Sequence, residues 1–324
     1  MGNCFKTLNE STAEIVPSDF ARPSPAVRLY GSPTSSDTSY IRVALLYKPV
    51  SLQFIPSQTP PNFGFEAPVI QYGSDLISGS RATMLRYVET EFPDPPLVSS
   101  WGDETSPLVV RVTVLQHRSV TWHVERLVRW AEDMWRRGGK SRGDPVMGSP
   151  RMEVRKFGKN YSQLLEVMLD HAQMEEKIVF PILEKADRGL TKAANEEHAR
   201  DLPIMNGIKE DIKAIGVLDS GTPIYQEALS RLPPRLKTLQ KHCREHFKEE
   251  ERHLLSLMEA TELSKEQHVK VLDQCLDAMH GTHSHLFRFF IEGLVPRDAM
   301  QYLDLISRSS DQDRVLSMVN MIVE

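Results

Sequence analysis

The sequence of 324 residues predicts a small α/β unit, then an antiparallel four-helix bundle, then further C-terminal helices. Short β-type segments separated by loops lie before residue 98, whereas apolar residues recur at helical spacing from residue 108 onward. Short Gly- and Pro-containing breaks join the long helical segments, which favours antiparallel neighbours. The predicted divisions are a tether over 1–25, the α/β unit over 26–97, the bundle over 107–260 and a helical extension over 261–324.

The composition is that of a soluble globular protein, with 40% hydrophobic and 26% charged residues. A net charge of -5 without a dominant basic tract argues against nucleic acid as a partner. No run of 18 apolar residues is present, so no membrane span is expected. The three cysteines (Cys4, Cys243 and Cys275) are too scattered for a disulfide framework, which indicates a reducing, cytoplasmic compartment.

The N-terminus carries two lipidation signals. Removal of Met1 would expose Gly2 for myristoylation, and Cys4 offers a thiol for palmitoylation. A single myristoyl chain binds membranes only marginally, so the adjacent thiol matters. The sequence therefore predicts a protein held at the cytoplasmic face of a membrane, such as the plasma membrane, by its acyl groups.

The α/β unit is predicted element by element. Strands are expected over 27–30 and 52–55, and a hairpin over 68–77 with its turn at 73–75. Helices are expected up to residue 47, capped near Asp37, and over 80–91. The resulting order is β-α-β-β-β-α, which packs as a small sheet with helices beside it.

The bundle is predicted from four long amphipathic segments, separated by glycine- and proline-containing breaks. They cover residues 108–136, 151–187, 191–215 and 224–260. Shorter amphipathic segments follow from 264 to 322, with breaks at Gly281, Gly293 and Pro296.

Two His-x-x-x-Glu pairs lie on the apolar faces of the second and fourth long helices. His171 precedes Glu175 by four residues, and His246 precedes Glu250 by four, so each pair shares one helix face. A carboxylate on a buried face costs several kcal/mol unless something compensates its charge. Two such carboxylates with histidine partners indicate a shared metal site.

Each of the other two long helices places one histidine on its apolar face. These are His117 on the first helix and His198 on the third. The candidate ligands are therefore His117, His171, Glu175, His198, His246 and Glu250. Six imidazole and carboxylate ligands suit two metal ions, with iron the first choice and manganese the second.

Five other histidines, at 123, 242, 280, 283 and 285, are not counted among the six candidate ligands. His123 is expected at the surface or rim of the bundle. His242 is a possible further ligand or hydrogen-bond partner of a ligand. The histidines over 280–285 are expected in a solvated loop beside Gly281.

The helical region resembles the hemerythrin-like, or HHE cation-binding, domains over residues 108–260. The resemblance lies in HAQMEEKIVFPILE over 171–184, HFKEEE over 246–251 and QHR over 116–118. It implies a di-iron centre, bridged by Glu175 and Glu250, that binds, senses or reduces O₂. Invertebrate hemerythrins have a further histidine where this chain has Leu202, which favours iron sensing, storage or redox chemistry over reversible O₂ carriage.

The α/β unit resembles the thioredoxin-like N-terminal domain of glutathione S-transferases over residues 26–97. The resembling segments are LYGS at 29–32, RVAL at 42–45, APVI at 67–70 and SGSRA at 78–82. The resemblance implies a cis bond before Pro68 and a glutathione site at Ser35 and Ser80. Gly79 replaces the expected acidic residue and no cysteine or proline accompanies Ser35, so a scaffold without a working site is expected.

The function predicted from these patterns is a non-haem di-iron protein, with iron and O₂ as partners and no clear catalytic nucleophile. Two alternatives stay open. One is a glutathione transferase-like enzyme, and the other is an interaction module that metal only stabilises.

Overall fold

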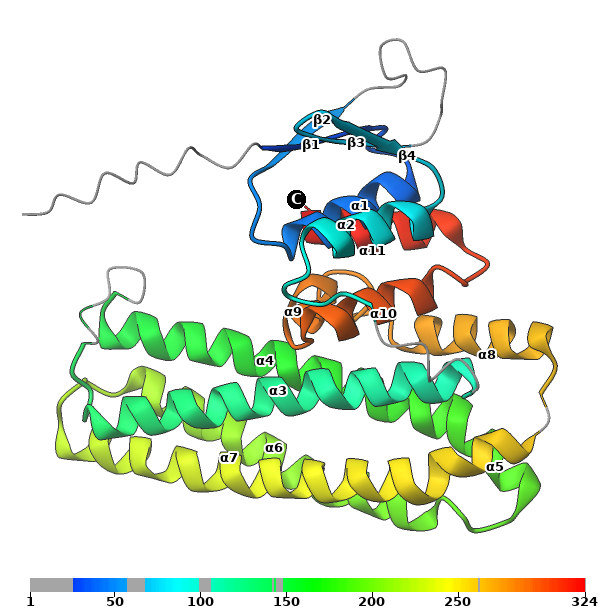
Figure 1. Ribbon diagram of the computed structural model, residues 1–324. Coiled ribbons are helices and arrows are strands. Elements are labelled where there is room, and N and C mark those ends of the chain that lie inside the picture. The colour runs from blue at the N-terminus through cyan, green and yellow to red at the C-terminus, as the bar shows by residue number, and fades with distance from the viewer. Residues whose placement is uncertain are drawn as a thin grey trace, which may run out of the picture.

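The structure is a computed structural model that describes residues 26–56, 68–98, 106–141, 143, 148–261 and 263–323. The molecule has three layers (Figure 1). The C-terminal helices lie between an α/β unit on one side and a bundle of long helices on the other. The predicted lipidation positions, Gly2 and Cys4, lie outside the described residues. Among the described helices, none is both long and apolar enough to cross a membrane.

The α/β unit contains a four-stranded mixed sheet. Its strands are β1 (Val27–Gly31), β2 (Leu52–Pro56), β3 (Val69–Tyr72) and β4 (Asp75–Ser78). The strand order is β2-β1-β3-β4, with β1 and β2 parallel and the other pairs antiparallel. The predicted strand segments are confirmed, and Gly73 at the hairpin turn adopts the positive φ that glycine tolerates.

Two helices, α1 (Ser36–Leu46) and α2 (Arg81–Glu91), cover one face of this sheet (Figure 1). The Ser35 hydroxyl caps α1 by accepting from the backbone N–H of Thr38, so the cap lies two residues before the predicted Asp37. Asp37 instead pairs with Arg81 at 2.6 Å, which links the first turns of the two helices.

Four long helices pack in a ring, each against the next, and match the predicted segments closely. They are α3 (Leu108–Arg136), α4 (Pro150–Met174), α6 (Lys192–Val217) and α7 (Pro223–Glu249). Buried aliphatic and aromatic side chains fill the ring, among them Phe157, Leu164 and Leu236. A shorter helix, α5 (Phe180–Ala186), continues the direction of α4.

The sequence predicted continuous helices over 151–187 and 224–260, but in the structure the second and fourth long helices are both interrupted. A π-helical turn interrupts each one, at Glu175–Val179 and at Glu250–Leu254, and a 3₁₀ segment (Leu255–Thr261) follows the second. Pro181 follows the first turn and cannot donate a backbone hydrogen bond, which disfavours an uninterrupted α-helix there. Both turns begin at a predicted metal-binding glutamate, and π turns are frequent at functional sites.

The C-terminal helices join the two larger parts. They are α8 (Lys265–Ala278), α9 (Phe287–Glu292), α10 (Pro296–Ile306) and α11 (Gln312–Val323). The first three lie against α3, while α11 packs against α1 (Figure 1). Ser39 donates to Asn320 at 2.8 Å and Arg42 to the carbonyl of Val323 at 3.1 Å. The chain end is therefore fixed to the α/β unit.

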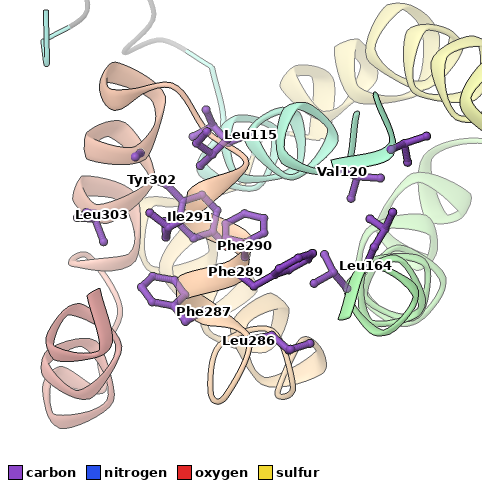
Figure 2. Close-up of a cluster of buried hydrophobic side chains, with 14 of the residues drawn as sticks. Leu115, Val120, Leu164, Leu286, Phe287, Phe289, Phe290, Ile291, Tyr302 and Leu303 are labelled. Atoms are coloured by element: carbon purple, nitrogen blue, oxygen red, sulfur yellow. The ribbon is translucent and has the colours of Figure 1, made fainter. Parts of the chain in front are cut away.

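Helix α9 is the apolar centre of the C-terminal layer. Figure 2 shows its aromatic side chains packed among residues of the bundle and of α10, including Leu115, Leu164 and Tyr302. Phe289 stacks on His123 with 3.9 Å between ring centroids.

His123 and His283 are both buried, so the rim position predicted for His123 and the solvated position predicted for His283 were wrong, whereas His280 and His285 are exposed as predicted. His123 donates to the Phe289 carbonyl at 2.8 Å, and His283 accepts from the Tyr302 hydroxyl at 2.6 Å. Burial lowers the pKa of each imidazole to about 3, which leaves both neutral. The covering residues come from distant segments, so the pattern of one helix or loop did not reveal the burial.

Candidate metal centre

The six predicted side chains meet in the middle of the bundle. His117 comes from α3, His198 from α6, and each His-x-x-x-Glu pair from the junction of a long helix with its π turn. The potential ligand atoms form two groups, each within 4.8 Å. One group contains His117 and His171, the other contains His198 and His246, and both contain Glu175 and Glu250. Their role as metal ligands stays a prediction.

The two carboxylates lie between the histidines. Glu175 places Oε1 3.3 Å from Nε2 of His171 and Oε2 3.4 Å from Nε2 of His198. Glu250 places Oε2 3.4 Å from Nε2 of His117 and 3.5 Å from Nε2 of His246. Each carboxylate thus lies close to a histidine of the first group and also to a histidine of the second, as a ligand that bridges two ions must.

Each of the four histidines forms a hydrogen bond through Nδ1, the ring nitrogen that faces away from the centre. The partners, named the outer partners below, are Glu251 for His117 (2.9 Å), Gln116 for His171 (3.0 Å), Glu176 for His198 (2.9 Å) and Glu197 for His246 (2.7 Å). An oxygen acceptor at Nδ1 places the proton there in the neutral imidazole, so Nε2 presents a lone pair to the centre. This is how metal-binding histidines are normally oriented.

The inward atoms lack the partners that buried polar atoms need. Nε2 of His117, Nε2 of His171 and both oxygens of Glu250 are buried without a hydrogen-bond partner among the described residues. Nε2 of His198 lies 3.0 Å from Nε2 of His246, although both Nδ1 protons already point at carboxylates. In the neutral imidazoles that metal binding requires, the Nε2 lone pairs would face each other and the carboxylates, an arrangement that cations stabilise, so this donor set fits metal ions.

Electrostatics of the metal-free centre lead to the same conclusion. Burial and the charge of Glu175 raise the pKa of Glu250 above its ordinary value. Burial also opposes ionisation of Glu175, but His171 and the neighbouring imidazoles outweigh it and hold its pKa well below the usual range. Without a cation the two carboxylates therefore titrate apart, because two adjacent negative charges are unfavourable in a dry site.

The histidine pKa values differ with their surroundings. Burial lowers the pKa of His171, whose outer partner is a neutral amide, to about 3. Burial also disfavours charge on His198, but Glu175 and Glu176 outweigh it and raise its pKa to about 9. His117, which faces Glu175, Glu250 and Glu251, likewise has a pKa raised well above 6.5. The centre without metal is therefore partly protonated, and metal binding must displace those protons.

The outer partners were not predicted, although the sequence contains a signal for two of them. Glu176 follows Glu175 and Glu251 follows Glu250, so in the second and fourth long helices another glutamate comes directly after the candidate bridging glutamate. In each pair the first glutamate faces the centre and the second supports a histidine on the neighbouring helix. His242 lies outside both groups and pairs with Asp201 at 2.8 Å.

Buried hydrogen bonds also lie beside the centre and within the C-terminal helices. Gln116 accepts from His171. Tyr302 donates to His283, whose Nδ1 donates to the carbonyl of Leu276.

A cavity of about 560 Å³ reaches three of the histidines from one side of the bundle. It lies among α4, α6 and α7, and His171, His198 and His246 contribute to its lining. Leu202, at the position expected to hold a further histidine in the invertebrate proteins, lines this cavity with an apolar side chain.

A comparison with protein families assigns the bundle to a known class. Residues 109–258 match the family described as hemerythrin HHE cation binding domain, and this span includes all six candidate ligands. The chain therefore contains an HHE cation-binding domain with a buried His/Glu centre consistent with two metal ions. A comparison with curated proteins gives no match for the chain.

The predicted glutathione positions lie in the α/β unit, away from the bundle. Ser35 and Ser80 each cap a helix, and their hydroxyls accept from the backbone N–H groups of Thr38 and Thr83. Pro68 directly precedes β3, and the bond that joins it to Ala67 lies outside the described residues. The unit itself is a small mixed sheet with helices on one face.

Proposed function

We propose that the bundle binds two iron ions, bridged by Glu175 and Glu250, and acts in iron or O₂ sensing, binding or redox chemistry. The observation that carries this proposal is the orientation of four imidazole Nε2 atoms toward two shared carboxylates, with an outer partner on every Nδ1. Iron bound there would supply one-electron chemistry and affinity for O₂. Manganese satisfies the same donor set and ranks second.

The protein's own residues would control this chemistry in two ways. The outer partners fix the tautomer of each histidine and increase its basicity as a ligand. Apolar Leu202 faces the cavity where a further nitrogen ligand would bind, which supports an open coordination position on the side of His198. This supports sensing or redox chemistry in preference to reversible O₂ carriage.

Metal analysis of the purified full chain tests the proposal. We expect about two iron ions per chain, and near-complete loss in the double variant His171→Ala/His246→Ala. The matched control is His253→Ala/His285→Ala, which removes two exposed histidines and should retain the iron. Iron-free protein from iron-replete cells, with a melting temperature unaffected by added iron, would contradict the proposal.

Spectroscopy distinguishes the main proposal from an interaction module. The reduced protein should change its optical and Mössbauer spectra when exposed to air, because a redox or O₂-binding centre must respond to oxygen. Two bound metal ions with spectra indifferent to air would favour a module that metal only stabilises. Elemental analysis separates iron from manganese in the same sample.

A glutathione site in the α/β unit is the second candidate, and it ranks lower. Its support is the order of strands and helices, together with the two serine caps at adjacent helix N-termini, where an anion is favoured. The Asp37–Arg81 pair, which already neutralises a charge at this place, weighs against it. Retention on immobilised glutathione that is lost in Ser80→Ala would favour this candidate.

Domain boundaries and membrane attachment complete the proposal. The proposed domains are the bundle over 107–260, the α/β unit over 26–97 and the helical extension over 261–324. The contact of α11 with α1 joins the extension to the α/β unit. Limited proteolysis should then cut outside these ranges. Acylation of Gly2 and Cys4 would place the protein on a membrane. Labelling with myristate and palmitate analogues tests this, because the variants Gly2→Ala and Cys4→Ser should lose the myristate and the palmitate label, respectively.

A further inference from the structure

The cavity beside the centre is much larger than O₂ requires. Its volume of about 560 Å³ lies within the range of roughly 300–1,000 Å³ found for pockets that hold small organic molecules. A water-sized molecule occupies only about 30 Å³ in the liquid. The cavity could therefore accommodate an organic ligand beside the candidate metal ligands at its inner end.

The walls of the cavity are mostly apolar. Met168, Leu202, Met205 and Phe247 line it, and Ala199 contributes only a methyl group, which leaves space next to His198. Two of the large exposed hydrophobic side chains of the described residues stand at its mouth, Leu169 at 43% exposure and Leu202 at 44%. The walls thus favour the apolar body of a ligand.

The charged residues of the lining leave one cation without a partner. Glu176 is bound to His198 at 2.9 Å, and Asp201 to His242 at 2.8 Å. Lys177 lies at the exposed edge of the cavity and forms no ion pair within the part of the chain that the structure describes. The polar group of a fitting ligand is therefore an anion.

We propose that this cavity binds an amphipathic organic acid, with its carboxylate at Lys177 and its apolar body against Met168, Leu202 and Met205. The ligand extends toward His171, His198 and His246, so it lies beside the ions of the proposed function. The inference rests on the proposed function only in assuming metal ions at the inner end of the cavity. It adds to that function the class of molecule that approaches the metal centre.

Binding of decanoate and 1-decanol to the purified full chain tests the proposal. Both should displace a fluorescent apolar probe, 1-aminoanthracene, and decanoate should bind about tenfold more tightly than decanol because of the ion pair with Lys177. Lys177→Gln should remove that preference, whereas Lys209→Gln, an exposed lysine on α6 outside the cavity, should keep it.

Steric variants test the location of the site. Leu202→Trp should weaken decanoate binding by about tenfold or more, and Val217→Trp, on the same helix but outside the cavity, should not. Ala199→Leu is a second way to reduce the space if the tryptophan variant fails to fold. Equal affinity for decanoate and decanol, or unchanged affinity in a folded Leu202 or Ala199 variant, overturns the proposal.

Metal content measured on the same samples keeps the two proposals separate. A chain that holds its iron but binds neither compound overturns the cavity proposal alone. A chain that binds decanoate in the cavity but takes up no metal supports the cavity proposal and overturns the di-iron function.

Discussion

The two halves of the centre have the same ligand types but different surroundings. The half with His117 and His171, named the closed half, lies on α3 and α4, which the C-terminal helices cover (Figure 1). The half with His198 and His246, named the open half, lies on α6 and α7, and both of its histidines line the cavity, which reaches only His171 of the closed half. The side chain of His198 is 12% exposed, whereas that of His117 is 2% exposed and stacks on Phe247.

This difference separates two tasks that a metal centre must perform. The closed half is held by packing, with His117 stacked on Phe247, and by the hydrogen bond of His171 to Gln116, which suits a rigid anchor for one ion. In the open half both outer partners are carboxylates and both histidines line the cavity, which suits exchange with a ligand. The variants below test whether the halves behave differently or as one unit.

The largest effect is expected from Glu175→Ala, because this carboxylate faces both halves. Metal content should fall from about two ions per chain to nearly none, since both ions lose a ligand and a compensating charge. Metal analysis after loading with ferrous iron measures the result. Glu249→Ala, which changes an exposed glutamate at the end of α7, is the control. Retention of one full ion would show that the bridge is not shared.

Single histidine variants should affect one half each. We expect His171→Ala and His198→Ala each to reduce the metal content to about one ion per chain, because two carboxylates and the other histidine pair remain for the second ion. The ion that remains after His171→Ala should exchange faster with a chelator, because it lies in the half beside the cavity. Identical exchange rates in the two variants would remove the distinction between open and closed halves.

Outer-partner variants should have a smaller effect on metal binding. Gln116→Leu in the closed half and Glu197→Leu in the open half each leave one Nδ1 without its acceptor. Loss of such a partner typically weakens metal affinity by about 10–100-fold. Competition with a chelator measures it, and Glu196→Leu, an exposed neighbour of Glu197, provides the control. Wild-type affinity in both variants would mean that the Nδ1 contacts do not orient the ligands.

The smallest effect is expected in the pH dependence of the metal-free protein, and it should have opposite sign for His198 and His171. The pKa of His198 is raised to about 9, so its contribution is complete below the unfolded value near 6.5 and is lost as pH rises through 9. The pKa of His171 is lowered to about 3, so its contribution is complete above 6.5 and decreases as pH falls toward 3. Melting temperatures of His198→Gln and His171→Gln across this range measure both slopes. Parallel curves for wild type and the two variants would contradict the assignment.

Local patterns predicted much of the fold. The span of α3 agrees with the predicted 108–136, and the strands, hairpin and C-terminal helices lie where the periodicity placed them. The six candidate ligands could be selected because a polar residue on an apolar helix face stands out in a single helix. The π turns at Glu175 and Glu250 were not predicted, and the first shifts the buried face by one residue, so that Val179 and Leu183 are buried whereas Ile178 and Ile182 are half-buried.

Contacts between distant segments were not predicted. The burial of His123 depends on Phe289, and that of His283 on Tyr302, so neither residue differs locally from a surface histidine. The packing of α11 against α1 joins the two ends of the described chain, and no periodicity within either helix specifies its partner. Only Glu176 and Glu251 among the outer partners had a local signal, the doubled glutamate.

The sequence by itself determined which helices form and which polar side chains face the interior, because both follow from spacing along a single helix. The tertiary structure decided that these side chains meet around two shared carboxylates, that each Nδ1 has its own acceptor and that both histidines of one half line the cavity but only one of the other half does. The reason is that hydrogen bonds and burial depend on distances between helices, whereas helical periodicity depends only on neighbours along the chain.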